Sequence, residues 1–186
     1  MVAYNIYKLL KEELKNGSSD LVTRKSGQAI RERIERDIEN EESGEVIALD
    51  FSKIGVIDYS CADEIVAKLI SRLLSNEYGD KYILLTGLSD NQKENIEVAL
   101  ERKDLAVIAE MRDGERVLLG NLHNYLKDTL DAIQKKGKIT AKELSEARKI
   151  EANTSGTRLL NLHKKRLVRK IDETRNGTRV WVYERV

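Results

Sequence analysis

Three short apolar runs, separated by stretches with helical periodicity, most constrain the fold of this chain. Residues 45–51 read EVIALDF, residues 82–86 read YILLT and residues 105–111 read LAVIAEM. Runs of about four to eight aliphatic and β-branched residues are typical of strands that are buried on both faces. Between these strands, helical spacing of apolar residues predicts helices over 26–40, 60–75 and 89–102. The alternation predicts an α/β layer, in which helices cover a small mixed sheet.

Local signals set the remaining boundaries of this first region. Residues 2–10 alternate loosely, which favours a strand. Ser89 and Gln92 have capping-box spacing at the start of the helix over 89–102. Arg112-Asp113-Gly114 is typical of a tight turn, after which the chain returns as a strand over 115–119.

From residue 121 the pattern changes to three helices followed by a hairpin. Helices are predicted over 121–136, 140–150 and 157–165, with a turn over 151–156. Thr140 can cap the second helix, with Glu143 at the capping-box position. Strands over 166–172 and 178–184 flank Asn176-Gly177, the strongest hairpin signal in the chain. Three helices and a hairpin within about 65 residues are the order of a winged helix-turn-helix.

The charge of the chain changes sign at the same point. Residues 1–119 carry 17 Lys/Arg and 24 Asp/Glu, a net charge of −7, whereas residues 120–186 carry 16 and 8, a net charge of +8. Such a change favours two domains, over 1–119 and 120–186, with different partners. The basic domain is the candidate for contact with a phosphate backbone.

Composition excludes several other classes of protein. Hydrophobic residues make up 40% of the chain, too many for a disordered protein. Cys61 is the only cysteine, so no internal disulfide can form and a reducing cytoplasm is the expected location. No run approaches the roughly 20 apolar residues that span a bilayer, and the first residues lack the apolar run of a signal peptide. We therefore expect no contact with a membrane.

The last third of the chain carries a resemblance to a known family. The segments ITAKELSEARKI and TSGTRLLNLHKKRLVRKIDETRNGTRVWVYERV resemble the winged-helix transcription regulators of bacteria and archaea. In that resemblance, residues 157–165 are the recognition helix, and Arg166 replaces a usual glycine before Leu167-Val168-Arg169. The resemblance implies binding of double-stranded DNA. It also implies a homodimer, with the helix over 121–136 at its interface, because palindromic sites match a two-fold axis.

A recognition helix needs polar and basic side chains on its outer face, where they meet base edges and phosphates. We expect this face to be formed by Thr154, Ser155, Thr157, Arg158, Asn161 and Lys165. Phosphate contacts are expected from Lys164, Arg175 and Arg179, with Arg175 at the wing tip. Arg158 and Asn161 are expected to set sequence selectivity. The alternative interpretation is that these charges are only a solvated surface.

Residues 1–119 carry a second resemblance. The sequences LVTRKSGQAIRERIERDI and VIALDFSKIGVIDYSCADEIVAKLI resemble STAS-like domains, which are related to anti-sigma factor antagonists. In those antagonists the helix start reads Asp-Ser-Ser-Gly, and a partner kinase phosphorylates the second serine. Ser60 stands at that position after Asp58, whereas Tyr59 and Cys61 depart from the pattern. The resemblance implies a partner switch at Ser60 and an anti-sigma or kinase-like ATPase as partner. Without phosphorylation, Ser60 is expected to cap the helix, with Asp63 at capping-box spacing.

No catalytic constellation is evident in the sequence. His123 and His163 are the only histidines, no Gly-rich phosphate loop occurs, and no cluster has metal-ligand spacing. We expect neither a metal nor a cofactor, and we expect His123 to be structural and His163 to be at the surface or partly buried. Trp181 has inward spacing and is expected in the core. Asp50 is expected to accept loop amides, with a cation shared with Asp58 as the alternative.

Three classes of function follow from these observations. We expect a DNA-binding transcription regulator, in which a STAS-like domain senses a partner or signal. The alternative is a protein-interaction module of a partner-switching system, without DNA binding. An enzyme that acts through Cys61 is the third class, and it is disfavoured because no histidine lies near this thiol in the sequence.

Overall fold

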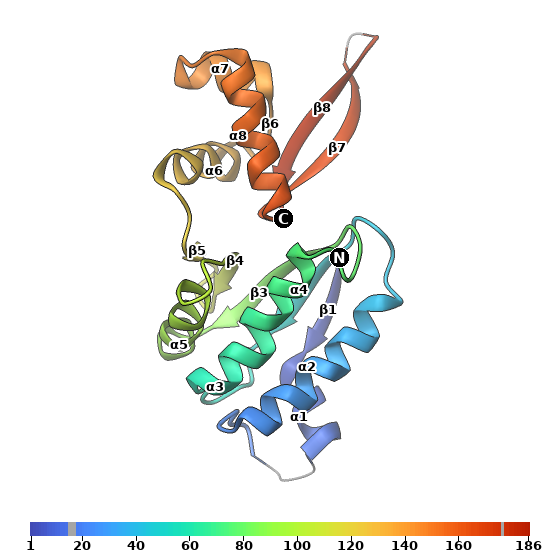
Figure 1. Ribbon diagram of the computed structural model, residues 1–186, viewed down its shortest axis with the longest axis vertical. Coiled ribbons are helices and arrows are strands. Elements are labelled where there is room, and N and C mark those ends of the chain that lie inside the picture. The colour runs from blue at the N-terminus through green and yellow to red at the C-terminus, as the bar shows by residue number, and fades with distance from the viewer. Residues whose placement is uncertain (15–17, 176) are drawn as a thin grey trace. The chain divides into compact units, whose positions relative to one another are not determined.

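The computed structural model describes residues 1–14, 18–175 and 177–186. The chain forms two compact units, Met1–Asn121 and Leu122–Val186. The first unit is built on a five-stranded sheet, and the second combines helices with a three-stranded sheet (Figure 1). Among the described helices, none has the length and apolar composition needed to cross a lipid bilayer.

The sheet of the first unit is mainly parallel, and its strands lie side by side in chain order. They are β1 (Val2–Asn5), β2 (Val46–Asp50), β3 (Tyr82–Leu88), β4 (Ala106–Met111) and β5 (Arg116–Gly120). Neighbours from β1 to β4 are parallel, whereas β5 returns antiparallel to β4. The turn between β4 and β5 contains Gly114 at φ +86°, a backbone conformation that favours glycine. The predicted α/β layer with a mixed sheet is confirmed.

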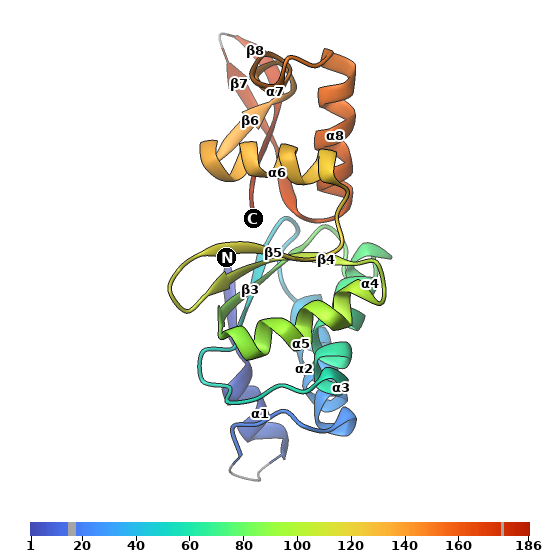
Figure 2. The same cartoon turned by 90° about the vertical axis from the view of Figure 1, so that its left-hand side faces the viewer.

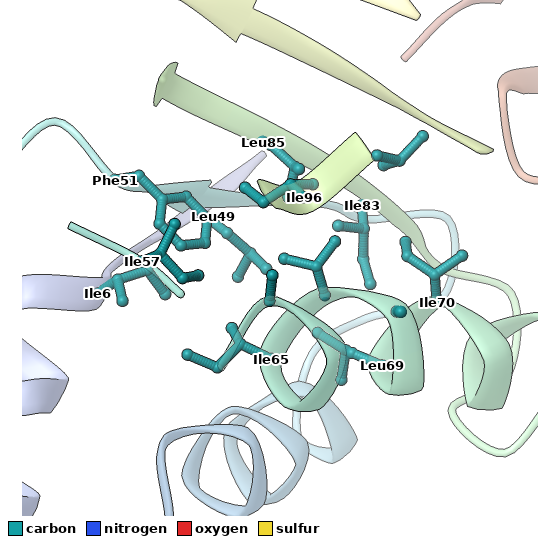
Figure 3. Close-up of a cluster of buried hydrophobic side chains, with 14 of the residues drawn as sticks. Ile6, Leu49, Phe51, Ile57, Ile65, Leu69, Ile70, Ile83, Leu85 and Ile96 are labelled. Atoms are coloured by element: carbon teal, nitrogen blue, oxygen red, sulfur yellow. The ribbon is translucent and has the colours of Figure 1, made fainter. Parts of the chain in front are cut away.

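Helices connect the parallel strands of this sheet. They are α1 (Ile6–Leu14), α2 (Arg24–Glu39), α3 (Tyr59–Ala62), the π-helical segment η1 (Asp63–Lys68), α4 (Leu69–Leu74) and α5 (Asp90–Glu101). Right-handed crossovers between strands in chain order all pass over the same face of a sheet. The helices accordingly cover one face (Figure 2). The core between sheet and helices includes the buried side chains of Leu49, Phe51, Ile65, Leu69, Ile83 and Leu85 (Figure 3).

The prediction of one strand over residues 2–10 is wrong beyond Asn5. The chain becomes helical at Ile6, and Ile6, Leu9 and Leu10 are buried. Their i, i+3, i+4 spacing places all three on one face of α1, which explains why a helix forms there. The capping box of Ser89 and Gln92 at the start of α5 is confirmed.

The second unit consists of helices α6 (Asn124–Lys136), α7 (Ala141–Arg148) and α8 (Ala152–Lys164), with strands β6 (Lys138–Thr140), β7 (Val168–Arg175) and β8 (Thr178–Arg185). The strands form an antiparallel sheet in the order β6-β8-β7. The core contains Leu126, Leu130, Ile133, Ile139, Leu144, Leu159, Leu162 and Val182. The predicted capping box of Thr140 and Glu143 at the start of α7 is confirmed.

One local prediction for the second unit needs correction, and one strand of this unit has no counterpart among the predictions. The turn predicted over 151–156 is shorter, because Lys149 adopts a left-handed conformation that ends α7 and α8 already begins at Ala152. The short strand β6 was not predicted. Of the predicted Asn176-Gly177 turn, Asn176 lies outside the described residues, whereas Gly177 has φ +77° and the strands pair as far as Arg175 and Thr178.

Candidate functional site

The outward face of α8 is polar and free of carboxylates. Its thirteen residues, ANTSGTRLLNLHK, include no Asp or Glu. Ser155, Leu159 and Leu162 form the buried stripe of this helix. Thr154, Thr157 and Lys164 are exposed, and Arg158, Asn161 and Lys165 are half-buried. The polar and basic side chains expected from the sequence therefore share one side of the helix, with the exception of Ser155.

Ser155 lies on the opposite side of α8 and corrects the expectation that it faces a ligand. The residue is fully buried, and its hydroxyl donates a hydrogen bond of 3.2 Å to the carbonyl of Glu151. Because α8 begins at Ala152, Ser155 stands one turn before Leu159 and two turns before Leu162. That spacing places Ser155 on the buried side of α8.

A shallow hollow of about 390 Å³ borders the outward face of α8 on the side of α6. It is lined by Tyr125, Asn153, Thr154, Thr157, Arg158 and Asn161. The Arg158 Cζ lies 5.4 Å from the centre of the Tyr125 ring, within cation–π range. The Tyr125 ring is stacked on His123, with centres 5.8 Å apart and planes 9° apart. Sequence reasoning missed Tyr125, because only the packing of α6 beside α8 brings it to this face.

Two cations expected to contact phosphates from the hairpin, Arg175 and Arg179, differ from those of α8, because carboxylates pair with them. Arg175 donates hydrogen bonds to Glu173 at 3.0 Å and to Glu143 at 3.3 Å. Arg179 is paired with Asp172 across the hairpin. By contrast, Lys164 and Lys165 form no ion pair with any described residue. Among the cations expected to contact phosphates, those of α8 therefore keep their charge uncompensated, whereas Arg175 and Arg179 do not.

Trp181 is half-exposed, so the expectation that it lies in the core is wrong. The two residues that follow it, Val182 and Tyr183, are buried, whereas 52% of Trp181 is accessible. The Nζ of Lys170 lies 3.9 Å from the centre of its ring system, and the Arg179 Cζ lies 5.9 Å away. Trp181 also borders a cavity of about 660 Å³, lined in addition by Thr140, Ala141, Lys142, Glu143, Glu146, Gly156, Arg175, Val180 and Tyr183.

In the first unit, Ser60 lies in the first turn of α3 but does not cap it. Asp58 is the cap residue, and its Oδ1 accepts hydrogen bonds from the Cys61 backbone N–H at 2.8 Å and from the Ser60 hydroxyl at 2.9 Å. The predicted capping role of Ser60 with Asp63 is therefore corrected. Ser60 is half-buried, and its side chain is held against a carboxylate.

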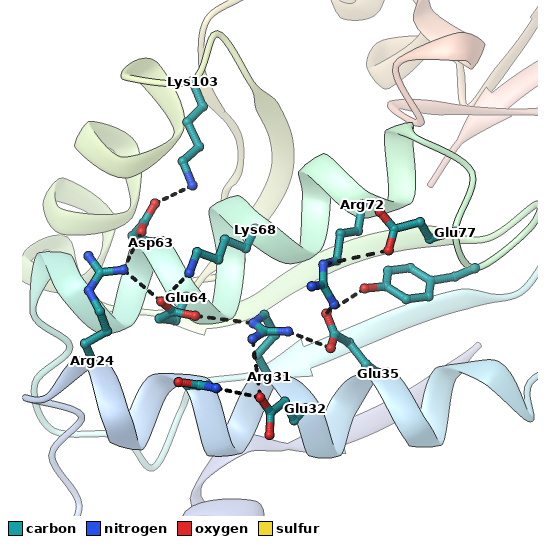
Figure 4. A network of polar contacts seen from close by, with 12 residues as sticks. Arg24, Arg31, Glu32, Glu35, Asp63, Glu64, Lys68, Arg72, Glu77 and Lys103 are labelled. Carbon is teal, nitrogen blue, oxygen red and sulfur yellow. Dashed lines mark hydrogen bonds and ion pairs between the residues drawn. The ribbon is translucent and has the colours of Figure 1, made fainter.

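Asp63 belongs instead to a network of ion pairs that connects α2, η1 and the turn after α5 (Figure 4). Arg24 contacts Asp63 at 3.0 Å and Glu64 at 2.7 Å, while Lys103 contacts Asp63 at 2.6 Å. Burial favours the neutral form of Asp63, yet the hydrogen bonds from Lys103 and Arg24 outweigh burial and lower the pKa of this carboxyl. Asp63, three residues after Ser60 in the sequence, is therefore already paired with two cations.

Glu64 is the central carboxylate of the same network. Only 2% of Glu64 is exposed, and it is paired with Arg24, with Lys68 and, at 3.4 Å, with Arg31. Burial again opposes ionisation, but Lys68 and Arg24 lower the pKa of Glu64 below its ordinary value. The network continues through Glu35, which accepts hydrogen bonds from Arg31, Arg72 and Tyr78. These ion pairs and hydrogen bonds connect the helices beside the turn that contains Ser60.

Cys61 is not placed to act as a nucleophile. Its side chain is fully buried, and the thiol donates a hydrogen bond of 2.9 Å to the carbonyl of Thr23. Burial, together with the charge of Asp58, raises the pKa of the Cys61 thiol to about 12. The thiol is therefore neutral near pH 7, whereas nucleophilic cysteines are thiolates.

Asp50 and the histidines have structural contacts. Asp50 accepts hydrogen bonds from the Ser52 N–H at 2.9 Å and from the Asn5 side chain at 2.8 Å, so it satisfies a loop amide as expected. His163 is half-buried, and its Nδ1 lies 3.4 Å from the carbonyl oxygen of Val168. Within the described residues, no group of three or more His, Cys, Asp or Glu side chains is arranged to hold a metal ion.

Comparison with the models of known protein families gives no match for this chain, and no curated protein matches its sequence.

Proposed function

We propose that this chain is a DNA-binding transcription regulator. In this proposal the unit Leu122–Val186 is a winged-helix domain that binds duplex DNA, and the unit Met1–Asn121 is a STAS-like domain that senses a partner or signal. The observation that carries the proposal is the outward face of α8, which is accessible, polar and basic, and contains no carboxylate.

Topology and charge support the winged-helix assignment. The order α6, β6, α7, α8, β7, β8 is that of a winged helix, with α7 and α8 as the helix-turn-helix and β7–β8 as the wing. The unit carries a net charge of +8, as expected for contact with phosphates. A homodimer on a palindromic site is the arrangement that the resemblance favours.

Within this proposal, the centre of the α8 face reads the bases. Thr157 and Asn161 are one turn apart in the middle of the outward face. Among the described residues, the Asn161 side chain has no hydrogen-bond partner, so its amide remains available to a base edge. Asparagine pairs bidentately with adenine in the major groove. Lys164, exposed at the end of α8, contacts a phosphate.

We propose that the first unit senses the partner or signal that regulates the chain. Ser60 is the candidate switch, and an anti-sigma or kinase-like ATPase is the proposed partner class. The ion pairs of Asp63 and Glu64 support this assignment, because they reduce the like-charge repulsion between these two carboxylates and a phosphate on Ser60. Asp58 would still have to release the Ser60 hydroxyl, which would alter the surface at the start of α3.

A protein-interaction module without DNA binding is the second candidate. The observation that favours it is the half-exposed Trp181 beside the 660 Å³ cavity. Exposed tryptophan in a concave surface is typical of protein–protein interfaces. On this reading, the hairpin rather than α8 is the contact surface.

A selection experiment separates the two candidates. The purified full chain is used to enrich duplexes from a random-sequence pool. Its affinity for the enriched duplexes is then measured by fluorescence anisotropy at two salt concentrations. The proposal predicts enrichment of a common sequence, and an affinity that falls by at least about ten-fold between 50 and 200 mM salt. Failure to enrich any duplex, together with recovery of an ATPase partner by the same protein, would favour the second candidate.

A further inference from the structure

Arg158 lies at an edge of α8 rather than at the centre of its outward face. It stands one turn from Ser155 and one turn from Leu162, both of which are buried. Its side chain is therefore next to the buried stripe, on the side where α8 meets α6. Thr157 and Asn161 occupy the centre.

Tyr125 holds the guanidinium of Arg158 at this edge. The Arg158 Cζ lies 5.4 Å from the centre of the Tyr125 ring, and the Tyr125 ring is itself stacked on His123. Arg158 forms no ion pair with any described residue. The N–H groups of the guanidinium therefore remain available, because a cation–π contact leaves its hydrogen-bond donors free to bind another group.

The shape of a duplex gives these positions different partners. A helix in the major groove turns its central stripe toward the base edges and its flanks toward the two phosphate backbones. We propose that Arg158 grips a backbone phosphate and that Tyr125 of α6 is the positioning residue that orders Arg158 for this contact. This inference rests on the proposed function, and it changes the role that the sequence predicted for Arg158.

The inference assigns different roles in DNA binding to Arg158 and Asn161. Arg158 contributes affinity without sequence preference, whereas Asn161 contributes selectivity. The fork of the guanidinium fits a phosphate in bidentate fashion, and a side chain that is already ordered loses less entropy on binding. Lys165, two turns after Arg158 on the same edge, continues this line of positive charge.

The test uses the full chain and measures the slope of log affinity against log salt on the best duplex and on single-base variants of it. The variants are Arg158→Gln, Tyr125→Leu, Tyr125→Phe and Asn161→Ala. Lys53→Gln is the matched control, since it removes one exposed positive charge from a loop of the first unit. Circular dichroism confirms that each variant is folded.

For Arg158→Gln we expect about ten-fold weaker binding to every duplex alike, and a slope smaller by about one. Tyr125→Leu weakens binding about three-fold and Tyr125→Phe recovers most of that loss, because the ring is the group that matters. In a chain that already carries Arg158→Gln, Tyr125→Leu should not weaken DNA binding further. A purely structural role of Tyr125 would instead predict an additional loss of affinity. Asn161→Ala changes the ranking of duplexes and keeps the slope, and Lys53→Gln changes neither.

Two results would overturn the inference, and they are distinguishable. If Arg158→Gln changes the ranking of duplexes while the slope stays constant, Arg158 reads bases and the inference fails although DNA binding stands. If the wild-type chain binds no duplex in a salt-dependent manner, the proposed function fails and the inference fails with it.

Discussion

Gly27 of α2 packs against Cys61 of α3 so closely that a Cβ atom at Gly27 would lie 3.0 Å from the Cα of Cys61 and 3.0 Å from the Cβ of Glu64. Cys61 and Glu64 lie in packed helical segments, α3 and η1, and their backbones cannot shift without disturbing that packing. Gly27→Ala should therefore lower the free energy of unfolding of the first unit by about 1–2 kcal/mol, although alanine is the better helix former. Urea unfolding followed by circular dichroism measures the change.

Gly156→Ala is the matched control for this prediction. Gly156 is also helical, but an added Cβ there would meet nothing within 4 Å. The second unit should gain up to about 1 kcal/mol from the higher helix propensity of alanine. Trp181, the only tryptophan of the chain, reports the unfolding of this unit separately. Equal effects at Gly27 and Gly156 would contradict the close packing of α2 on α3.

Cys61 provides an independent probe of the same contact. Its thiol is buried and its pKa is raised to about 12, so a thiol reagent should react with the native chain at least about a hundred-fold more slowly than with the urea-unfolded chain. Gly27→Ala should shorten the labelling time, because it loosens the cover over Cys61. Rapid labelling of the native wild-type chain would show that the thiol is accessible.

The ion pairs around Glu64 predict acid sensitivity of the first unit. The pKa values of Asp63, Glu64 and Glu35 are lowered in the folded state, so their stabilisation is present above the unfolded-state pKa of about 4 and is lost as the pH falls through the folded-state values. The free energy of unfolding should therefore decrease as the pH falls from 5 toward 3. Urea midpoints over this range measure the effect.

Glu64→Gln tests whether the network is the source of that sensitivity. The substitution leaves Arg24, Arg31 and Lys68 without their shared carboxylate, and it should cost about 3 kcal/mol at pH 7. It should also flatten the dependence on pH below 5. Glu94→Gln, on the exposed side of α5, should do neither. An unchanged pH profile in Glu64→Gln would assign the sensitivity to other carboxylates.

The cap of α3 can be assigned by two single substitutions. Asp58→Ala removes the acceptor of both the Cys61 N–H and the Ser60 hydroxyl, and should destabilise the first unit by about 1 kcal/mol. Ser60→Ala removes only the second of these hydrogen bonds and should cost less than about 0.5 kcal/mol. A larger loss in Ser60→Ala than in Asp58→Ala would restore Ser60 as the cap.

The α/β layer could be predicted because its strands are continuous apolar runs, and the capping boxes at Ser89 and Thr140 because they are local signals. Ser155 was misplaced because the predicted turn extends through residue 156. The buried face of the helix that follows was therefore not traced back as far as Ser155. Trp181 was misplaced because strict alternation does not hold in this part of β8, where two consecutive residues, Val182 and Tyr183, are both buried. The contact of Tyr125 with Arg158 joins two helices, and no spacing within either helix predicts it.

The most direct test of the proposed function is to map the contact surface by NMR, titrating the full chain with its best duplex. Chemical shifts should change most on the outward face of α8, at Thr157, Asn161 and Lys164, and less around the Trp181 cavity. Changes confined to the Trp181 cavity, or none at any duplex concentration, would contradict the claim that α8 is the surface that binds DNA.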